Sequence, residues 1–138
     1  NIDGLHQAAG SVNVLELHGS VHRNYCMKCR QGYDAQYVKD AQGVPRCRVC
    51  GGMIKPDVVL YEEPLDGETM ARAVEAIQEA DLMIVGGTSL AVYPAAGLIN
   101  YYRGSRLVLI NKTPTPYDSH ADLVIAGKIG EIFSQIEV

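Results

Sequence analysis

Two pairs of cysteines, each spaced as CxxC, are the feature that most constrains the fold of this chain. Cys26 and Cys29 form the first pair, and Cys47 and Cys50 form the second after an interval of 17 residues. Two thiolates on a tight turn can bind one metal ion, and two such turns complete a tetrahedral shell suited to zinc. Two disulfides are the alternative, but the remainder of the chain is enzyme-like rather than typical of a small secreted scaffold. We therefore expect bound zinc.

A site with four thiolate ligands has no open coordination position, so this metal is expected to be structural. Residues 21–55 contain few large apolar side chains that could form a core. Metal binding contributes on the order of 10 kcal/mol in small zinc modules, which is enough to hold such a segment folded. The sequence predicts a zinc-binding module over residues 22–55.

Composition limits the chain to one sizeable core. It has 138 residues, of which 47% are hydrophobic, and the added metal module needs no second core. No apolar run approaches the length of a membrane span. We expect a soluble, cytoplasmic protein with no membrane partner.

The charge is unevenly distributed, although the net charge is only −4. The zinc segment carries an excess of basic side chains and the rest of the chain is acidic. A basic zinc ribbon could contact phosphates, so a nucleic-acid-binding domain is the rival interpretation. The tyrosines of this segment, Tyr25, Tyr33 and Tyr37, show no repeated stacking pattern. A solvated surface is therefore favoured, and a nucleic-acid partner is not expected.

The remainder of the chain alternates between expected strands and expected helices. Apolar runs predict strands over 12–17, 55–63, 82–85, 106–111 and 121–127, and helical periodicity predicts helices over 66–80, 94–104 and 127–138. Strands that read as continuous apolar runs between helices indicate a parallel sheet covered on both faces. The predicted fold class is α/β, a Rossmann-like parallel sheet covered by helices, with a small inserted zinc-ribbon module.

Suitable ligand-binding groups follow three of these strands. In open parallel sheets, ligands bind beyond the carboxyl ends of the strands. Glycines there let the backbone approach a phosphate, and hydroxyls can donate to its oxygens. Ordinary turns also use these residue types, and no GxGxxG motif is present. Because such groups follow three strands whose ends would lie at the same edge of the sheet, a nucleotide is nevertheless favoured. The groups are Gly86, Gly87, Thr88 and Ser89, then Asn111, Lys112 and Thr113, and then Gly127 and Lys128.

His18 follows the expected strand over 12–17 and precedes Gly19. A neutral imidazole at a strand terminus can act as a base near neutral pH. A lone histidine more often has a structural role, so position alone leaves the role of His18 open.

The motifs taken together are more specific. NIDGLHQAAG, LELHGS, the paired CxxC motifs, IKPDVVLYEE, GGTSLAVYPAAGL and LVLINKTPT resemble the sirtuin family of NAD-dependent protein deacylases, in its bacterial form, along the whole chain. The resemblance implies an NAD-binding Rossmann domain over 1–21 and 56–138, around a zinc module over 22–55. It also implies that the family's N-terminal half, with its phosphate loop and cofactor lid, is absent. The isolated fragment is then expected to be inactive and to expose a sheet edge.

The resemblance assigns roles to individual residues. It makes His18 the general base, which deprotonates a ribose hydroxyl after nicotinamide has left, so that the acyl group migrates from lysine to ADP-ribose. The four cysteines are the zinc ligands. The expected NAD-binding residues are Asn1, Ile2, Asp3, Gly87, Thr88, Ser89, Asn111, Lys112, Thr113, Lys128 and Ile129. An acyl-lysine peptide is expected to pair as an added strand with Val58, Val59, Ala91, Val92 and Tyr93.

One position departs from the family pattern. Many sirtuins have an aromatic residue, a glycine and a glutamate after the paired valines, whereas this chain reads Tyr61, Glu62, Glu63. Glu62 would place a carboxylate beside the peptide groove, which predicts a mild preference for basic residues near the target lysine. The acyl group, the protein substrates and the oligomeric state stay open at this level.

Overall fold

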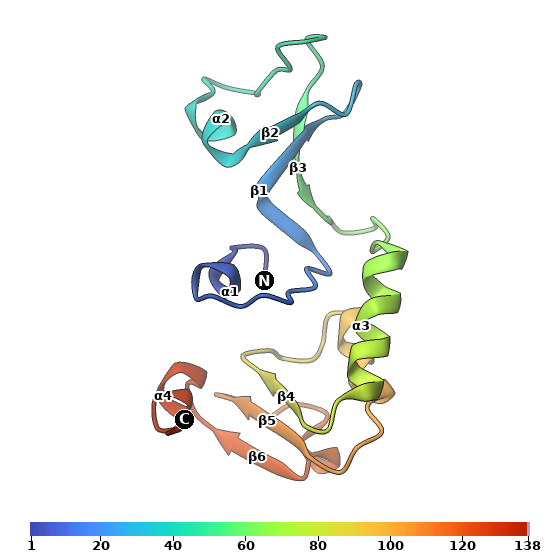
Figure 1. The fold of residues 1–138 in the computed structure, drawn as a ribbon, viewed down its shortest axis with the longest axis vertical. Coiled ribbons are helices and arrows are strands. Elements are labelled where there is room, and N and C mark those ends of the chain that lie inside the picture. Colours follow the sequence, from blue (N-terminus) through green and yellow to red (C-terminus); the bar gives the residue numbers. More distant parts are fainter. Residues whose placement is uncertain (138) are drawn as a thin grey trace. The chain divides into compact units, whose positions relative to one another are not determined.

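A computed structural model describes residues 1–137 and shows two compact units. Unit 1 spans Asn1–Met70, and unit 2 comprises the chain from Ala71 onward. Figure 1 shows the elements of both units, and each unit is described by itself.

Unit 1 is built around a three-stranded antiparallel sheet. Its elements are α1 (Leu5–Ala8), β1 (Gly19–Cys26), β2 (Gly32–Asp34), α2 (Ala35–Asp40) and β3 (Ile54–Val58), and the strand order is β2-β1-β3. Asp34 starts α2 because its carboxylate accepts a hydrogen bond from the backbone N–H of Tyr37 at 2.7 Å. The small core comprises Cys26, Cys47 and Ile54, with Tyr33 and Tyr37 packed against it.

Two strand predictions in this unit are wrong in their placement. Residues 12–17 form no strand, because a strand needs a partner and none of the described strands pairs with this segment. The predicted strand over 55–63 is β3 (Ile54–Val58), and it pairs antiparallel with β1 instead of joining the parallel sheet. The domain boundaries at 21 and 56 stay a prediction.

Unit 2 contains the predicted parallel sheet. Its elements are α3 (Gly67–Glu79), which includes the boundary between the units, followed by β4 (Met83–Gly86), η1 (Ala95–Tyr101), β5 (Leu107–Asn111), η2 (Asp118–His120), β6 (Leu123–Ala126) and α4 (Ile129–Phe133). The strand order is β4-β5-β6, with Val85 opposite Leu109 and Leu109 opposite Val124. The parallel α/β architecture expected from the apolar runs is confirmed.

One face of this sheet carries the core of unit 2. Leu107 and Leu109 of β5 are buried with Leu90, Ala96 and Ile99. Val108, which lies between them, points to the opposite face together with its register partners Ile84 and Leu123, and these two are 44% and 50% exposed. The expected cover on both faces is therefore incomplete in this structure.

The helices of unit 2 differ in detail from the prediction. The helix expected over 66–80 is confirmed as α3, whose first turn is capped by Asp66 through the N–H of Thr69 at 2.8 Å. The helix expected over 94–104 is the shorter η1, a 3₁₀ helix with i to i+3 hydrogen bonds, such as Tyr102 N–H to Ile99 O at 3.2 Å. The closing helix is α4, and Val138 of its predicted range lies outside the described residues. Among residues 1–137, no helix is long and apolar enough to span a membrane.

Candidate functional site

The four cysteines of unit 1 converge on one point. Their Sγ atoms all lie within 4.8 Å of one another, with Cys26 to Cys50 at 3.4 Å and Cys29 to Cys47 at 3.6 Å. All four thiols are free, and these distances far exceed the roughly 2.0 Å of a disulfide. Zinc–sulfur bonds of about 2.3 Å in a tetrahedron would place the sulfurs about 3.8 Å apart. The cluster therefore has the chemistry and the size of a structural zinc site.

The two cysteine turns are built in the same way. The Arg30 N–H donates to Cys26 O and the Gly51 N–H donates to Cys47 O, both at 2.9 Å, so each CxxC closes into one turn. Within each turn a backbone N–H, from Lys28 or Val49, lies 3.4 Å from the first sulfur. Such hydrogen bonds favour the thiolate form, which is the form that binds metal.

Tyr33 adds a contact to this cluster that sequence reasoning missed. Its Oη donates to Cys47 Sγ at 3.1 Å and accepts from the Arg48 N–H at 2.8 Å. The hydrogen bond from Tyr33 lowers the pKa of the Cys47 thiol to about 6. A hydroxyl aimed at a ligand sulfur orients it from outside the metal shell. No spacing in the sequence could have indicated this contact.

The tyrosines of the zinc module are engaged within the module. The rings of Tyr33 and Tyr37 lie 4.5 Å apart, Arg30 lies 4.0 Å above the Tyr25 ring, and Arg48 lies 4.6 Å above the Tyr37 ring. Cation–π contacts of this kind use aromatic faces that would otherwise be available for stacking on bases.

His18 lies on a turn that leads directly into β1. The Gly19 N–H donates to Glu16 O at 2.9 Å, and His18 O accepts from the Val59 N–H at 3.1 Å. Gly19 has φ +75°, and a Cβ at this position would lie 1.9 Å from Asp57 O. Glycine is required here because β3 passes so close to the turn. The half-buried His18 is thus held at the junction of β1 and β3.

Asn1, Ile2 and Asp3 lie beside the start of β1. The Val21 N–H donates to Ile2 O at 3.0 Å, and the His22 ring nitrogen Nε2 lies 2.8 Å from Asp3 O. The N–H of Leu5 donates to the Asp3 carboxylate and lowers its pKa. The structure therefore brings this predicted nicotinamide segment into the same unit as His18.

A pocket of about 600 Å³ lies at the carboxyl ends of β4, β5 and β6. Gly127 and Gly130 contribute to its lining, and sequence reasoning missed Gly130. Every residue of unit 2 that the family resemblance assigns to NAD binding also lines it, namely Gly87, Thr88, Ser89, Asn111, Lys112, Thr113, Lys128 and Ile129, whereas Gly86 is not among the lining residues. Three turns separated in sequence thus meet at one edge of the sheet, as the parallel topology requires.

The composition of this pocket suits a nucleotide. Lys112 supplies positive charge, and Lys128 is paired with Glu131. The Asn111 amide, which donates to Thr113 O at 2.9 Å, leaves its own oxygen to accept. Gly87 has φ +64°, and nothing lies within 4 Å of the position that a Cβ would take. The backbone there is open to a close approach by phosphate or ribose.

The predicted peptide-binding residues fall in both units. Val58 ends β3, and Val59 is bonded to His18 O in unit 1. In unit 2, Val92 and Tyr93 are 56% and 66% exposed. Val92 O accepts from the Ala96 N–H at 2.8 Å, which ties this exposed segment to η1.

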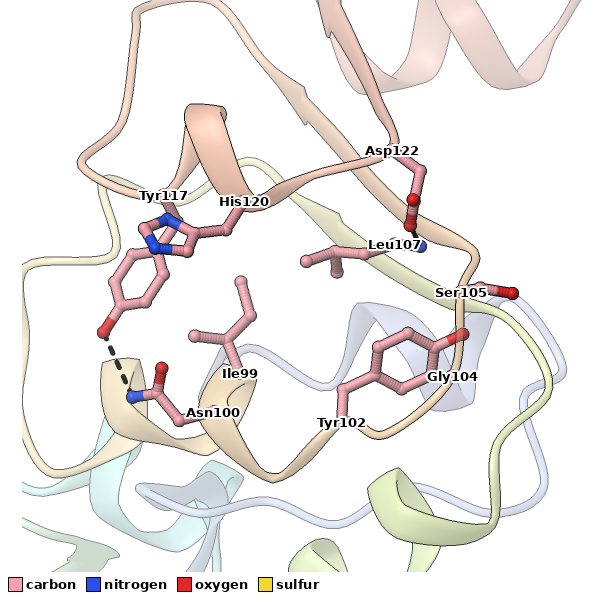
Figure 2. A pocket seen from close by; sticks show the side chains of 9 residues that line it. All are labelled: Ile99, Asn100, Tyr102, Gly104, Ser105, Leu107, Tyr117, His120 and Asp122. Atoms are coloured by element: carbon pink, nitrogen blue, oxygen red, sulfur yellow. Dashed lines mark hydrogen bonds between the residues drawn. The ribbon is translucent and has the colours of Figure 1, made fainter.

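A second cavity of unit 2, about 410 Å³, contains none of the predicted residues (Figure 2). Ile99 and Leu107 line it with Tyr117 and His120, and Asn100 donates to Tyr117 Oη at 3.3 Å. Leu107 begins β5, so this cavity lies at the amino ends of the strands, away from the strand-end pocket.

The fold and the sites define an α/β protein with a Rossmann-type sheet, a ligand pocket at its strand ends and a four-cysteine metal module. The model of the Sir2 family matches residues 1–94. An NAD-dependent protein deacetylase of Clostridium perfringens (strain 13 / Type A) is 61% identical over 137 residues, which are 99% of this chain and 56% of that relative. One from Clostridium acetobutylicum is 60% identical with the same coverage. The chain belongs to the Sir2 family.

Solved structures agree with this assignment. A Sir2 structure with a p53 peptide and NAD⁺ gives a TM-score of 0.90 at 38% identity, covering 98% of this chain and 58% of the other. A Sir2 complex with the inhibitor EX-527, 2′-O-acetyl-ADP-ribose and a deacetylated p53 peptide gives a TM-score of 0.90 at 40% identity. That match covers 98% of this chain and 60% of the other. The chain thus spans little more than half the length of these relatives.

Proposed function

We propose that this chain is part of an NAD-dependent protein lysine deacylase, which transfers the acyl group from lysine to ADP-ribose with release of nicotinamide. The observation that carries the proposal is the strand-end pocket, which gathers eight residues predicted from three separate turns. Membership of the Sir2 family supports it. We place the protein in the cytoplasm because four free thiols at metal-binding distance suit a reducing compartment.

Each part of the site has a separate task in this reaction. The four cysteines would hold zinc, which fixes the end of β1 and has no position open to substrate. The residues of the strand-end pocket would bind the adenosine and phosphate portion of NAD, and Asn1, Ile2 and Asp3 the nicotinamide end. Bound NAD supplies the ribose to which the acyl group is transferred. His18 would accept the proton of a ribose hydroxyl.

Val58 and Val59 in unit 1 and Ala91, Val92 and Tyr93 in unit 2 are proposed to bind the acyl-lysine peptide. Exposed backbone next to a strand end can pair with an extended peptide, and such pairing makes little demand on the flanking sequence. The acyl-lysine side chain, and not the surrounding sequence, would then carry most of the recognition.

Replacing His18 by alanine tests the proposed reaction. In the full-length protein, H18A is expected to lower kcat for NAD-dependent deacylation of an acetyl-lysine peptide at least about 100-fold, the usual range for a lost general base. Mass spectrometry of acetyl-, succinyl- and myristoyl-lysine peptides would measure it, with H120A, which removes an exposed histidine, as the control. Absence of turnover in the wild type, with zinc bound and the fold intact, would refute the enzyme proposal and favour a binding domain.

Glu62 is proposed to bias the choice of peptide. It is exposed and has φ +69°, a conformation that favours the glycine found there in many sirtuins. E62Q removes the charge and leaves the backbone unchanged, so it is expected to lower the preference for basic-flanked over acidic-flanked peptides by about threefold. Competition between the two peptides would measure the ratio, and equal rates on both in the wild type would contradict the proposal.

A further inference from the structure

We propose that Arg23 is a positioning residue for His18, holding the turn that carries it by pairing with Glu16 and Asp57 at once. The inference rests on the proposed function, because it assigns His18 a place in the reaction. Arg23 lies within β1 and is not expected to touch substrate or cofactor.

The contacts of Arg23 join the two sides of the His18 turn. Its Nη1 lies 2.5 Å from Glu16 Oε2, and its Nε lies 3.0 Å from Asp57 Oδ2. Glu16 precedes His18 by two residues, and Asp57 is the strand partner of Ser20 on β3. The Arg23 guanidinium therefore links the segment that precedes His18 to strand β3.

The same two neighbours also define the backbone of the turn. Glu16 O accepts from the Gly19 N–H at 2.9 Å, and Asp57 O lies where a Cβ at position 19 would be. The turn has no room to shift toward β3, and the hydrogen bond from the Gly19 N–H is the backbone contact that holds Glu16 on the other side. The ion pair with Arg23 adds a side-chain contact that keeps Glu16 in place on this side of the turn.

The burial of Glu16 makes this pair more than an ordinary surface contact. Its side chain is 10% exposed, and its other oxygen, Oε1, accepts from Gln7 Nε2 at 2.9 Å. Surface ion pairs contribute little because solvent screens them, and a pair with one shielded partner is screened less. The hydrogen bond from Arg23 also lowers the pKa of the Glu16 carboxyl, in keeping with a charged pair.

Only arginine can make both contacts. Its planar fork presents Nε and Nη1 to two carboxylates, whereas the ammonium of lysine is a single point. Arg30 provides a matched control, because it lies in the same unit, stacks on Tyr25 and has no ion pair among the described residues. R23Q and R30Q remove the same charge, but only R23Q releases Glu16.

The kinetic test uses these variants in the full-length protein. R23Q is expected to lower kcat for deacylation about tenfold, because small displacements of a catalytic group are costly, with KM for NAD and for peptide changed less than about twofold. R23K is expected to recover part of the loss, and R30Q to behave as wild type. Equal kcat for R23Q and R30Q would overturn the inference. A decrease in the kcat of R23Q that is fully explained by a smaller fraction of folded protein would also overturn it.

Amide hydrogen exchange gives a readout that does not depend on activity. The Gly19 and Val59 amides, which bond to Glu16 O and His18 O, are expected to exchange at least about tenfold faster in R23Q, while amides of β5 keep their rates. Unchanged rates for Gly19 and Val59 would overturn the inference. A wild type without deacylase activity would overturn the proposed function, and amide exchange would then still decide whether Arg23 holds the turn.

Discussion

Removing zinc with a chelator is expected to unfold the module between Cys26 and Cys50 while the parallel sheet of unit 2 keeps its structure. The buried core of this module consists of Cys26, Cys47 and Ile54, and two of these three are expected metal ligands. The metal contributes on the order of 10 kcal/mol in modules of this kind, more than so small a core can replace. Metal analysis and an NMR spectrum recorded before and after chelation would measure the effect.

Variants of single ligands sharpen this test. C26S removes a fully buried thiol and C29S an exposed one, and both are expected to lose zinc because a tetrahedral site needs all four ligands. V49S, at an exposed position inside the second cysteine turn, serves as the control. A dispersed spectrum for the module in metal-free protein would show that its fold does not depend on zinc.

Replacing Gly19 by alanine is expected to have the second largest effect. The new Cβ would lie 1.9 Å from Asp57 O at a residue with φ +75°. Positive φ costs an alanine roughly 1–2 kcal/mol, and a forced shift of a packed strand adds about 1–3 kcal/mol. We expect G19A to lose about 2–5 kcal/mol of unfolding free energy and most deacylase activity, because the strand shift displaces His18.

Gly43 offers a control that separates the two causes. It also has a positive φ, +84°, but nothing lies within 4 Å of the position of its Cβ. G43A therefore adds the conformational cost alone, roughly 1–2 kcal/mol, without a clash. Urea unfolding of both variants would measure the difference. Equal losses would show that the approach of β3 to Gly19 imposes no further constraint.

The metal cluster and the strand-end pocket could be predicted because short-range patterns determine both. The CxxC spacing places two thiols on one tight turn. Residues that directly follow parallel strands are brought together at one edge of the sheet. Gly87, Asn111 and Lys128 therefore line one pocket although they are far apart in sequence.

Other features depend on partners that a sequence pattern does not reveal. Residues 12–17 are rich in apolar side chains like a strand, but a strand exists only where another pairs with it. Arg23 contacts Glu16 and Asp57, 7 and 34 positions away, and Tyr33 contacts Cys47 across 14 positions. Charged and aromatic residues are frequent on protein surfaces, so nothing marked these contacts in advance.

The connection between the two cysteine turns has a consequence for how this module can vary in length. The second turn is anchored by the bridge between Arg46 and Met53 and by β3, whereas Gln42, Gly43 and Val44 are exposed at the tip of the connection. Doubling the length of a flexible loop costs only about 0.6 kcal/mol in closure entropy. Insertions at this tip are therefore compatible with the same four-sulfur geometry, and the interval between the cysteine pairs is free to differ among otherwise equivalent proteins.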